Sequence, residues 1–528
     1  MTRGAAAARG GEGGWRWAAR WRDHRRTDLA LLALLAACVV FPGLGARDLW
    51  NPDEPRYGEV AREMRESGSF LVPQFNHRLY TQKPPLMFWS IAACAAVLGR
   101  LDEVAVRLPS ALAAIGSVLL VHALGRRLFD RRAAWIAAAV FLTSAKILWQ
   151  ARVGQIDMLL TFLVLCAVFC WIEGVLERRP ALSYLFFAFA GLATLAKGPV
   201  GLLPPLLSLL AFMTVTRDRQ ALRDLRLVRG LLLWAVIVLL WLAPAIAVAG
   251  RAYADEILVG QNVARFFAPT AHLRPSWYFG MVLPIDFLPW SFFLPAALAG
   301  ARWLDARQRR WVLMLLCWVA VTLIFFSLSP GKRTVYILTM YPALALLSGA
   351  GLAALSRAGR RARAWLAVPA GALAVLLWGI ALAAPAAATT AFVLALRPER
   401  AAQMVTAIAA GVAVTYVALF VGILPRLDSE LSLRPLAERV ARDLPESYEL
   451  ASLQEMEGGL LFYGSGSARE LWSAEELHSF LASDRRFWLV VDPDVLGMVT
   501  LPPGLPLDLV ARQGTRDDGV RIFSAPTR

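Results

Sequence analysis

The sequence predicts an α-helical, polytopic membrane protein with a small soluble α/β domain at its C-terminus. Hydrophobic residues make up 58% of the 528-residue chain, whereas ordinary soluble domains are about 45–50% apolar. They gather in runs close to the roughly 20 residues that a helix needs to cross a bilayer. From about residue 427 onward the runs are shorter and mixed with charges. We therefore expect a basic cytoplasmic N-terminus over residues 1–27, a transmembrane domain over 28–426 and a soluble domain over 427–528.

The predicted transmembrane domain contains about 13 candidate spans, and the loops between them alternate in positive charge. Short loops rich in arginine and lysine face the cytoplasm. The alternation holds if the shorter run 85–99 lies at the membrane surface and the stretch 364–396 forms two spans. The outer face then carries the loop 46–106, the segments 150–157, 250–277 and 328–334, and the C-terminal domain. The candidate spans are 28–45, 107–127, 132–149, 157–176, 181–196, 199–216, 228–249, 277–299, 309–327, 333–354, 364–380, 383–396 and 403–424.

The formal net charge of +16 would suggest nucleic-acid binding in a soluble protein. Here the basic residues lie in short loops between apolar runs, so we expect no nucleic-acid partner. The cysteines all lie in apolar segments and have neither a disulfide pattern nor the spacing of zinc ligands. They are Cys38, Cys94, Cys166, Cys170 and Cys317.

The C-terminal region combines helical and strand-like patterns. Helices are expected near residues 433–443 and 473–482, where apolar residues recur at helical spacing. Strands are expected at 460–463, 487–491, 507–510 and 520–523, which are short apolar runs between polar segments. This mixture predicts a small α/β domain.

Two adjacent acids open the first outer loop, in the motif Asp53-Glu54-Pro55-Arg56-Tyr57. Asp53 at the start of a helix, with Pro55 in the first turn, is a common capping arrangement. Capping explains one carboxylate, but it does not explain two acids, an arginine and a tyrosine at a membrane surface. We therefore predict catalytic roles for Asp53 and Glu54. A further acid, Asp157, opens a later span, where a charge usually has a partner or a function, and we count it as catalytic too.

The cations of the outer face are candidates for binding a phosphate. The chain has only four lysines, and three of them stand where a span begins or breaks: Lys83, Lys197 and Lys332. Ammonium groups and free backbone N–H groups at such breaks suit an anion. For the fourth, Lys146, snorkelling to the interface is the simpler explanation. Arg265 and His272 lie among aromatic residues of another outer segment, which suits either substrate binding or an aromatic belt.

These motifs together resemble one family. Asp53-Glu-Pro-Arg-Tyr57, Lys83-Pro-Pro-Leu86, Asp157-Met158, Lys197-Gly-Pro199 and Lys332 with Tyr336 and Tyr341-Pro342 are similar to the bacterial lipid A 4-amino-4-deoxy-L-arabinose transferases. These belong to the protein O-mannosyltransferase-like GT-C glycosyltransferases. The resemblance extends over roughly residues 28–350.

The resemblance implies a GT-C fold with about 13 membrane helices, a periplasmic C-terminal domain and an undecaprenyl-phosphate-linked sugar donor. It also implies an inverting transfer to lipid A phosphate, in the bacterial inner membrane and on its periplasmic face. Membrane lipids would surround the protein, and we expect a monomer. Asp53 and Asp157 would be the active-site acids. Substrate phosphate or sugar would be bound by residues of the outer face, which are Arg56, Tyr57, Tyr80, Gln82, Lys83, Lys197, Arg265, His272, Lys332, Arg333, Tyr336 and Tyr341.

One position departs from the family pattern. A glutamate typically precedes the lysine of the lysine-proline-proline motif, and here the residue is Gln82. A neutral amide offers no negative charge to a zinc ion or to the amino group of an aminosugar. We therefore expect no required cofactor and no metal, and the departure counts against a structural zinc.

Two other functions fit parts of the pattern. The same donor can serve a mannose-type transferase that acts on hydroxyl groups of proteins or glycans. A protein of a different class, a transporter of lipid-linked glycans, would also be polytopic. Transporters tend to have internal repeats and broken helices at the membrane midplane, whereas here no repeat is visible and the charges gather on the outer face.

Overall fold

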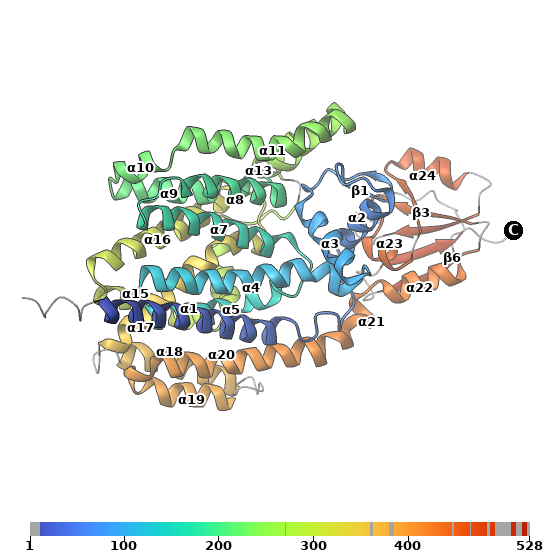
Figure 1. The fold of residues 1–528 in the computed structure, drawn as a ribbon. Coiled ribbons are helices and arrows are strands. Elements are labelled where there is room, and N and C mark those ends of the chain that lie inside the picture. The colour runs from blue at the N-terminus through green and yellow to red at the C-terminus, as the bar shows by residue number, and fades with distance from the viewer. Residues whose placement is uncertain are drawn as a thin grey trace, which may run out of the picture.

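In the computed structural model, the described residues are 11–269, 271–358, 363–379, 385–445, 448–464, 466–482, 486–491, 508–513 and 520–524. The first ten residues of the predicted N-terminal segment lie outside this set. Figure 1 shows a bundle of long helices, a middle layer formed by α2, α3 and β1, and a small sheet domain at the far end.

The predicted apolar runs form helices. Several begin at an aspartate whose side chain accepts a backbone N–H, as Asp102 does from Ala105 at 2.9 Å and Asp130 from Ala133 at 2.8 Å. Such caps satisfy the free donors of the first turn. The bundle helices are α1 (Gly11–Val40), α4 (Glu103–Leu128), α5 (Arg131–Leu142), α6 (Ala145–Gln150), α7 (Ile156–Leu176), α8 (Leu182–Lys197), α9 (Leu203–Val215), α10 (Arg219–Asp224), α11 (Leu227–Ala249), α14 (Tyr278–Asp286), α15 (Leu294–Gly300), α16 (Ala306–Leu328), α17 (Tyr341–Arg357), α18 (Arg363–Gly379), α19 (Pro385–Ala395) and α20 (Ala401–Ala418).

Six helices of the described part are long and apolar enough to cross a membrane, or seven if the bent pair Tyr278–Asp286 and Trp290–Trp303 is one span. The chain bends by 104° between the two helices of that pair, and the break contains Pro289, which has no backbone N–H to donate. The predicted span 132–149 is likewise divided, into α5 and α6. A count of about 13 membrane helices therefore stays a prediction.

Short irregular elements connect the bundle on the side of the middle layer. They include α12 (Arg251–Asp255), the π-helix η2 (Glu256–Ala264), α13 (Arg265–Phe267) and the 3₁₀-helix η5 (Thr334–Met340). The middle layer itself contains α2 (Asp53–Ser67), the hairpin strands β1 (Gln74–Phe75) and β2 (Arg78–Leu79), and α3 (Leu86–Leu98). Helix α3 is the short run that the sequence indicated should not cross fully.

The C-terminal domain is a five-stranded mixed sheet with the strand order β4-β3-β5-β7-β6. Strand β3 pairs in parallel with β4 and β5, while β7 is antiparallel to β5 and β6. The elements are α21 (Asp428–Leu431), α22 (Arg434–Asp443), β3 (Glu449–Leu453), α23 (Gly458–Gly464), β4 (Arg469–Leu471), α24 (Ala474–Leu481), β5 (Phe487–Val491), β6 (Asp508–Gln513) and β7 (Val520–Ser524).

The expected helices near 433–443 and 473–482 are confirmed as α22 and α24, and three expected strands as β5, β6 and β7. The strand expected at 460–463 is wrong, because these residues belong to α23. A run of four apolar residues is equally compatible with a buried helix. Here Leu460 and Leu461 are buried, in a helix that packs against α2 and α22.

Candidate active site

A pocket of about 110 Å³ lies where the membrane helices meet the middle layer. Its wall is formed by the start of α2, the segment 82–84, the start of α7, the end of α8, η2, α13 and the loop leading into η5. Nine of the predicted substrate or catalytic residues line it: Asp53, Tyr57, Gln82, Lys83, Asp157, Lys197, Arg265, Arg333 and Tyr336. Residues far apart in the sequence therefore meet in one cavity.

Asp53 is the first residue of α2, and its carboxylate does not cap the helix. Its Oδ2 atom instead accepts from Gln155 Nε2 at 2.9 Å and from Arg333 Nη2 at 3.1 Å. Gln155 is itself fixed by Gln150, whose amide donates to Gln155 Oε1 at 2.9 Å. Among the described residues no donor reaches Oδ1 of Asp53, so this oxygen is available to a substrate.

Asp157 forms a second charged pair across the pocket. Its Oδ1 atom contacts Lys197 Nζ, and the ammonium group lies 5.0 Å from the ring centroid of Tyr336. Asp157 comes from the first turn of α7 and Lys197 from the last residue of α8. The pair explains why a carboxylate is tolerated at the start of an apolar helix, because its charge has a partner.

Two cations of the pocket, Lys83 and Arg265, have no carboxylate within 4.0 Å in the part of the chain that the structure describes. Lys83 Nζ donates to the carbonyl of Gln82 at 3.1 Å, and Arg265 Nη1 donates to Gln261 Oε1 at 2.8 Å. Burial, together with the charges of Arg265 and Lys197, lowers the pKa of Lys83 to about 7. The pocket therefore has an excess of positive charge that an anion can neutralise.

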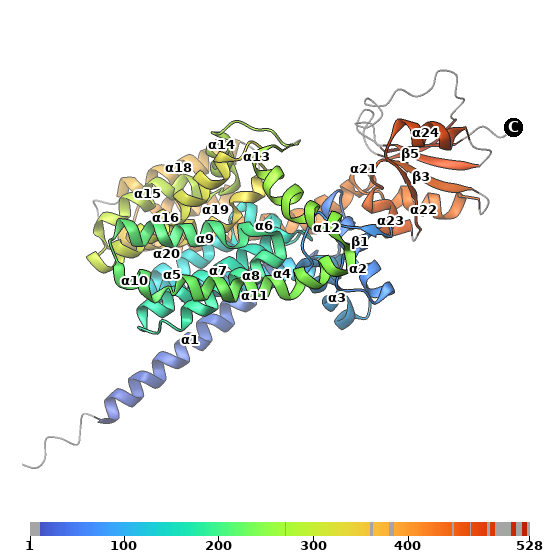
Figure 2. The same ribbon diagram turned by 90° about the horizontal axis from the view of Figure 1, so that it is seen from above.

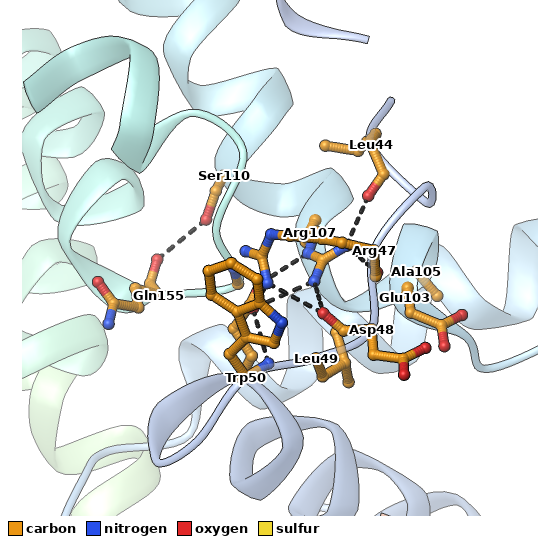
Figure 3. A network of polar contacts seen from close by, with 12 residues as sticks. Leu44, Arg47, Asp48, Leu49, Trp50, Glu103, Ala105, Arg107, Ser110 and Gln155 are labelled. Carbon is orange, nitrogen blue, oxygen red and sulfur yellow. Dashed lines mark hydrogen bonds and ion pairs between the residues drawn. The ribbon is translucent and has the colours of Figure 1, made fainter. Parts of the chain in front are cut away.

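Glu54 lies outside the pocket wall, and the catalytic role predicted for it stays a prediction. Its side chain is 2% exposed and does not line the pocket. Oε1 accepts from Arg107 Nε at 2.7 Å and Gly154 N at 2.9 Å, while Oε2 accepts from Arg47 Nη1 at 2.8 Å. Figure 3 shows both arginines over the segment from Asp48 to Trp50. These donors outweigh burial and lower the pKa of Glu54 to about 2, so the carboxylate is charged at neutral pH and holds its three partners in place.

Lys332 is also placed differently from the prediction. It is buried, and its ammonium group donates to the carbonyls of Ser329 and Arg274. Its neighbour Arg333 points into the pocket instead. Adjacent residues of an extended chain point to opposite sides, so only one of the two can face a substrate.

Four further predicted residues lie outside the pocket wall. Arg56 pairs with Glu455 of the C-terminal domain at 3.1 Å, and Tyr80 is buried against Phe75 and Phe88. His272 is exposed, and its carbonyl accepts the N–H of Lys332. Tyr341 is fully buried in the first turn of α17. Arg56 and Tyr80 belong to the layer behind the pocket, whereas Tyr341 is a core residue.

Sequence reasoning missed Gln155, Gln261 and Asn262. Gln155 holds Asp53, and the other two line the pocket from the π-helix η2. A signal existed for Gln155, because a polar residue two positions before Asp157 at the membrane surface needs a partner. For Gln261 and Asn262, the π-helical turn determines the direction of the side chains. No pattern in the sequence predicts this turn.

Among the described residues no group of three histidines, cysteines or acids is close enough to hold a metal ion. Gln82, where the family pattern has a glutamate, is 3.5 Å from Glu455 Oε1 through its Nε2 atom. An amide N–H donor facing a single carboxylate does not match the N, S or O donor set of a zinc site. The expectation that no metal is required remains a prediction.

Comparisons with known proteins agree with this architecture. A family model described as dolichyl-phosphate-mannose-protein mannosyltransferase matches residues 82–248. An undecaprenyl phosphate-α-4-amino-4-deoxy-L-arabinose arabinosyl transferase from Shewanella sediminis is 31% identical over 338 residues, 62% of this chain and 61% of the relative. The protein of that name from Pectobacterium carotovorum is 32% identical over 370 residues, 67% and 65% of the two chains. The chain thus matches less than two thirds of the length of these relatives.

Solved structures extend the likeness to nearly the whole chain. The crystal structure of ArnT from Cupriavidus metallidurans bound to undecaprenyl phosphate aligns with a TM-score of 0.75 at 24% identity, over 94% of this chain and 98% of that one. The archaeal oligosaccharyltransferase AglB from Archaeoglobus fulgidus aligns with a TM-score of 0.56 at 14% identity, over 89% and 69% of the two chains. The chain therefore has the fold of the solved ArnT structure, and over part of its length it is similar in sequence to the aminoarabinose transferases.

Proposed function

We propose that the protein is an inverting glycosyltransferase that takes its sugar from a polyprenyl-phosphate donor and transfers it to lipid A phosphate. The transferred sugar is 4-amino-4-deoxy-L-arabinose or a close relative of it. The observation that carries the proposal is the pocket's composition. Two carboxylates, Asp53 and Asp157, are each held by a cation, while Lys83 and Arg265 have no carboxylate within 4.0 Å among the residues that the structure describes.

The donor phosphate belongs between Lys83 and Arg265. When the bond between C1 of the sugar and the phosphate oxygen breaks, the electron pair leaves with that oxygen and negative charge develops on the phosphate. Positioned cations stabilise a charge that develops in the transition state. Both cations are already in place, and in the described part of the chain they donate to neutral oxygens rather than to a carboxylate. Little reorganisation is therefore needed when the reaction occurs.

Asp53 acts on the other side of the sugar. A phosphate acceptor is already ionised and needs no strong base, so an oxygen of that phosphate attacks C1 directly from the face opposite the leaving group. Oδ1 of Asp53 then orients the sugar or stabilises the positive charge that develops at C1. If the acceptor is a hydroxyl, the same oxygen takes its proton as a general base.

The relatives support the identity of the substrates. The sequence relatives carry the name of undecaprenyl-phosphate aminoarabinose transferases, and the solved relative of the same fold is bound to undecaprenyl phosphate. The charge alternation of the loops supports an active site on the periplasmic face of the inner membrane. Membrane lipids would surround the protein, which we take to act as a monomer without a cofactor.

A second acceptor class is favoured by one observation. Gln82 lines the pocket as a neutral residue, and the matching family model is described as a protein mannosyltransferase. A sugar without an amino group, transferred to a protein or glycan hydroxyl, would need no negative charge at this position.

The test is sugar transfer in membranes of a strain that lacks its own aminoarabinose transferase. Mass spectrometry of lipid A compares wild type with Asp53→Ala. We expect an added aminopentose with wild type and a loss of about 100-fold or more in the variant, the effect of removing one group that stabilises charge in the transition state. Unmodified lipid A in both strains would exclude this acceptor and leave the hydroxyl-directed transferase.

A further inference from the structure

The C-terminal domain reaches the wall of the pocket through one loop, residues 454–457, which we name the docking loop. It joins β3 to α23. Glu455 Oε2 lies 3.1 Å from Arg56 Nη2, and its Oε1 faces Gln82 Nε2 at 3.5 Å. Gln82 and the following Lys83 line the pocket, and Arg56 lies one turn after Asp53 on α2. Figures 1 and 2 both place α23 and β3 beside the middle layer.

The docking loop is held in a strained conformation. Gln454 has a φ of 66°, a left-handed conformation that persists in a residue other than glycine only where the surroundings impose it. They do so here, because Gln454 N donates to Leu471 O at 2.8 Å and Met456 N to Glu470 Oε1 at 3.1 Å. Glu455 is therefore presented to the pocket wall by a rigid backbone.

Helix α23, which follows the loop, is fitted closely to α2. A Cβ atom at Gly458 would lie 2.8 Å from the backbone nitrogen of Arg56, so only glycine allows this approach. At the other end, Arg62 donates to the carbonyls of Leu461 at 2.8 Å and Phe462 at 3.1 Å. The domain thus packs on the helix that begins with Asp53.

We propose that Glu455 is a positioning residue of the transfer reaction, which ties Arg56 on α2 to Gln82 and so fixes the Gln82–Lys83 wall relative to Asp53. The carboxylate bridges two segments that do not belong to the same element. The Nε2 atom of Gln82 faces Glu455, so the amide oxygen of Gln82 is available to accept a hydrogen bond in the pocket. The C-terminal domain is then part of the active site. The inference rests on the proposed function only in taking the anion that Lys83 binds to be the donor phosphate.

The test measures binding of undecaprenyl phosphate to the full-length protein in nanodiscs, and donor KM and kcat in the transfer assay. Glu455→Ala should weaken binding and raise the donor KM roughly tenfold, the effect of one lost charged hydrogen bond. It should lower kcat less than it raises KM, because Lys83 already binds the charged donor phosphate in the ground state and gains only the charge that develops in the transition state. Glu455→Gln, which can still accept from Arg56, should restore most of the affinity.

The matched control is Glu449→Ala. Glu449 lies on β3, the strand that precedes the docking loop, and it pairs with Arg469 within the C-terminal domain, so its loss should leave the affinity unchanged. If Glu455→Ala lowers the folded yield, Arg56→Ala and the double variant complete the test. Two residues that act through one contact have non-additive effects. Wild-type affinity in Glu455→Ala, or additive losses in the double variant, would overturn the proposal.

The two proposals fail in different ways. If wild type binds undecaprenyl phosphate in a manner that depends on Glu455 but modifies no lipid A, the positioning role stands and only the acceptor is wrong. If wild type does not bind undecaprenyl phosphate, the proposed donor is wrong.

Discussion

At the scale of single residues, Lys83 makes donor binding sensitive to pH. Its pKa is lowered to about 7 by burial and by the neighbouring cations. Below pH 7 the free protein carries the ammonium charge, and above pH 7 it must take up a proton to bind an anion. We therefore expect the affinity for the sugar-phosphate donor to fall as the pH rises through 7. Titrations of the donor between pH 6 and pH 9 in nanodiscs measure this.

The control for this prediction is Lys83→Arg, because a guanidinium stays charged over the whole pH range. The affinity of this variant for the donor should therefore be independent of pH. The glycosylated donor is the proper ligand, since a phosphodiester does not titrate near neutrality, whereas a phosphomonoester has a second pKa of about 6. A pH-dependent fall that persists in Lys83→Arg would assign the titration to another group.

At the scale of elements, Glu54 anchors the start of α2 to α4 and to the loop before α7. Its partners are Arg47, Arg107 and the N–H of Gly154. Replacing it by glutamine leaves two buried guanidinium groups without their counter-charge, and removing one partner of a buried pair costs about 3–5 kcal/mol. We expect Glu54→Gln to lower the unfolding temperature in detergent strongly. A full-length protein of unchanged stability that has lost activity would instead support a catalytic role for Glu54.

The same anchor predicts how stability depends on pH. The pKa of Glu54 is lowered from 4.5 to about 2 in the folded protein, so the folded state favours the ionised form. Its contribution is complete above pH 4.5 and is lost as the pH falls from 4.5 toward 2. The difference in stability between wild type and Glu54→Gln should shrink over this range.

At the scale of the whole molecule, the middle layer and the C-terminal domain lie at one end of the bundle (Figure 1), and the middle layer contributes Asp53, Tyr57, Gln82 and Lys83 to the pocket wall. We expect a cysteine at the exposed Ser467 of this domain to react with an impermeant thiol reagent in cells whose outer membrane alone is permeable. A cysteine at the exposed Arg178, in a basic loop between α7 and α8, should react only after the inner membrane is opened. Labelling in a background without the native cysteines measures both, and the reverse pattern would contradict the proposed orientation.

The sequence by itself determined the helical membrane architecture, the separate C-terminal domain with most of its elements, and the charged residues of the pocket. These features follow from local properties of the sequence. Long apolar runs form membrane helices, and charged residues at the ends of such helices indicate a partner or a function. Tertiary structure alone decided which of two neighbours faces the pocket. Asp53 and Arg333 face the pocket. Glu54 and Lys332 instead form buried polar contacts with residues of distant segments, Arg107 and Arg274. It also decided that Glu455, more than 370 residues from Gln82, lies behind the pocket wall, because only the folded chain determines which distant segments pack together.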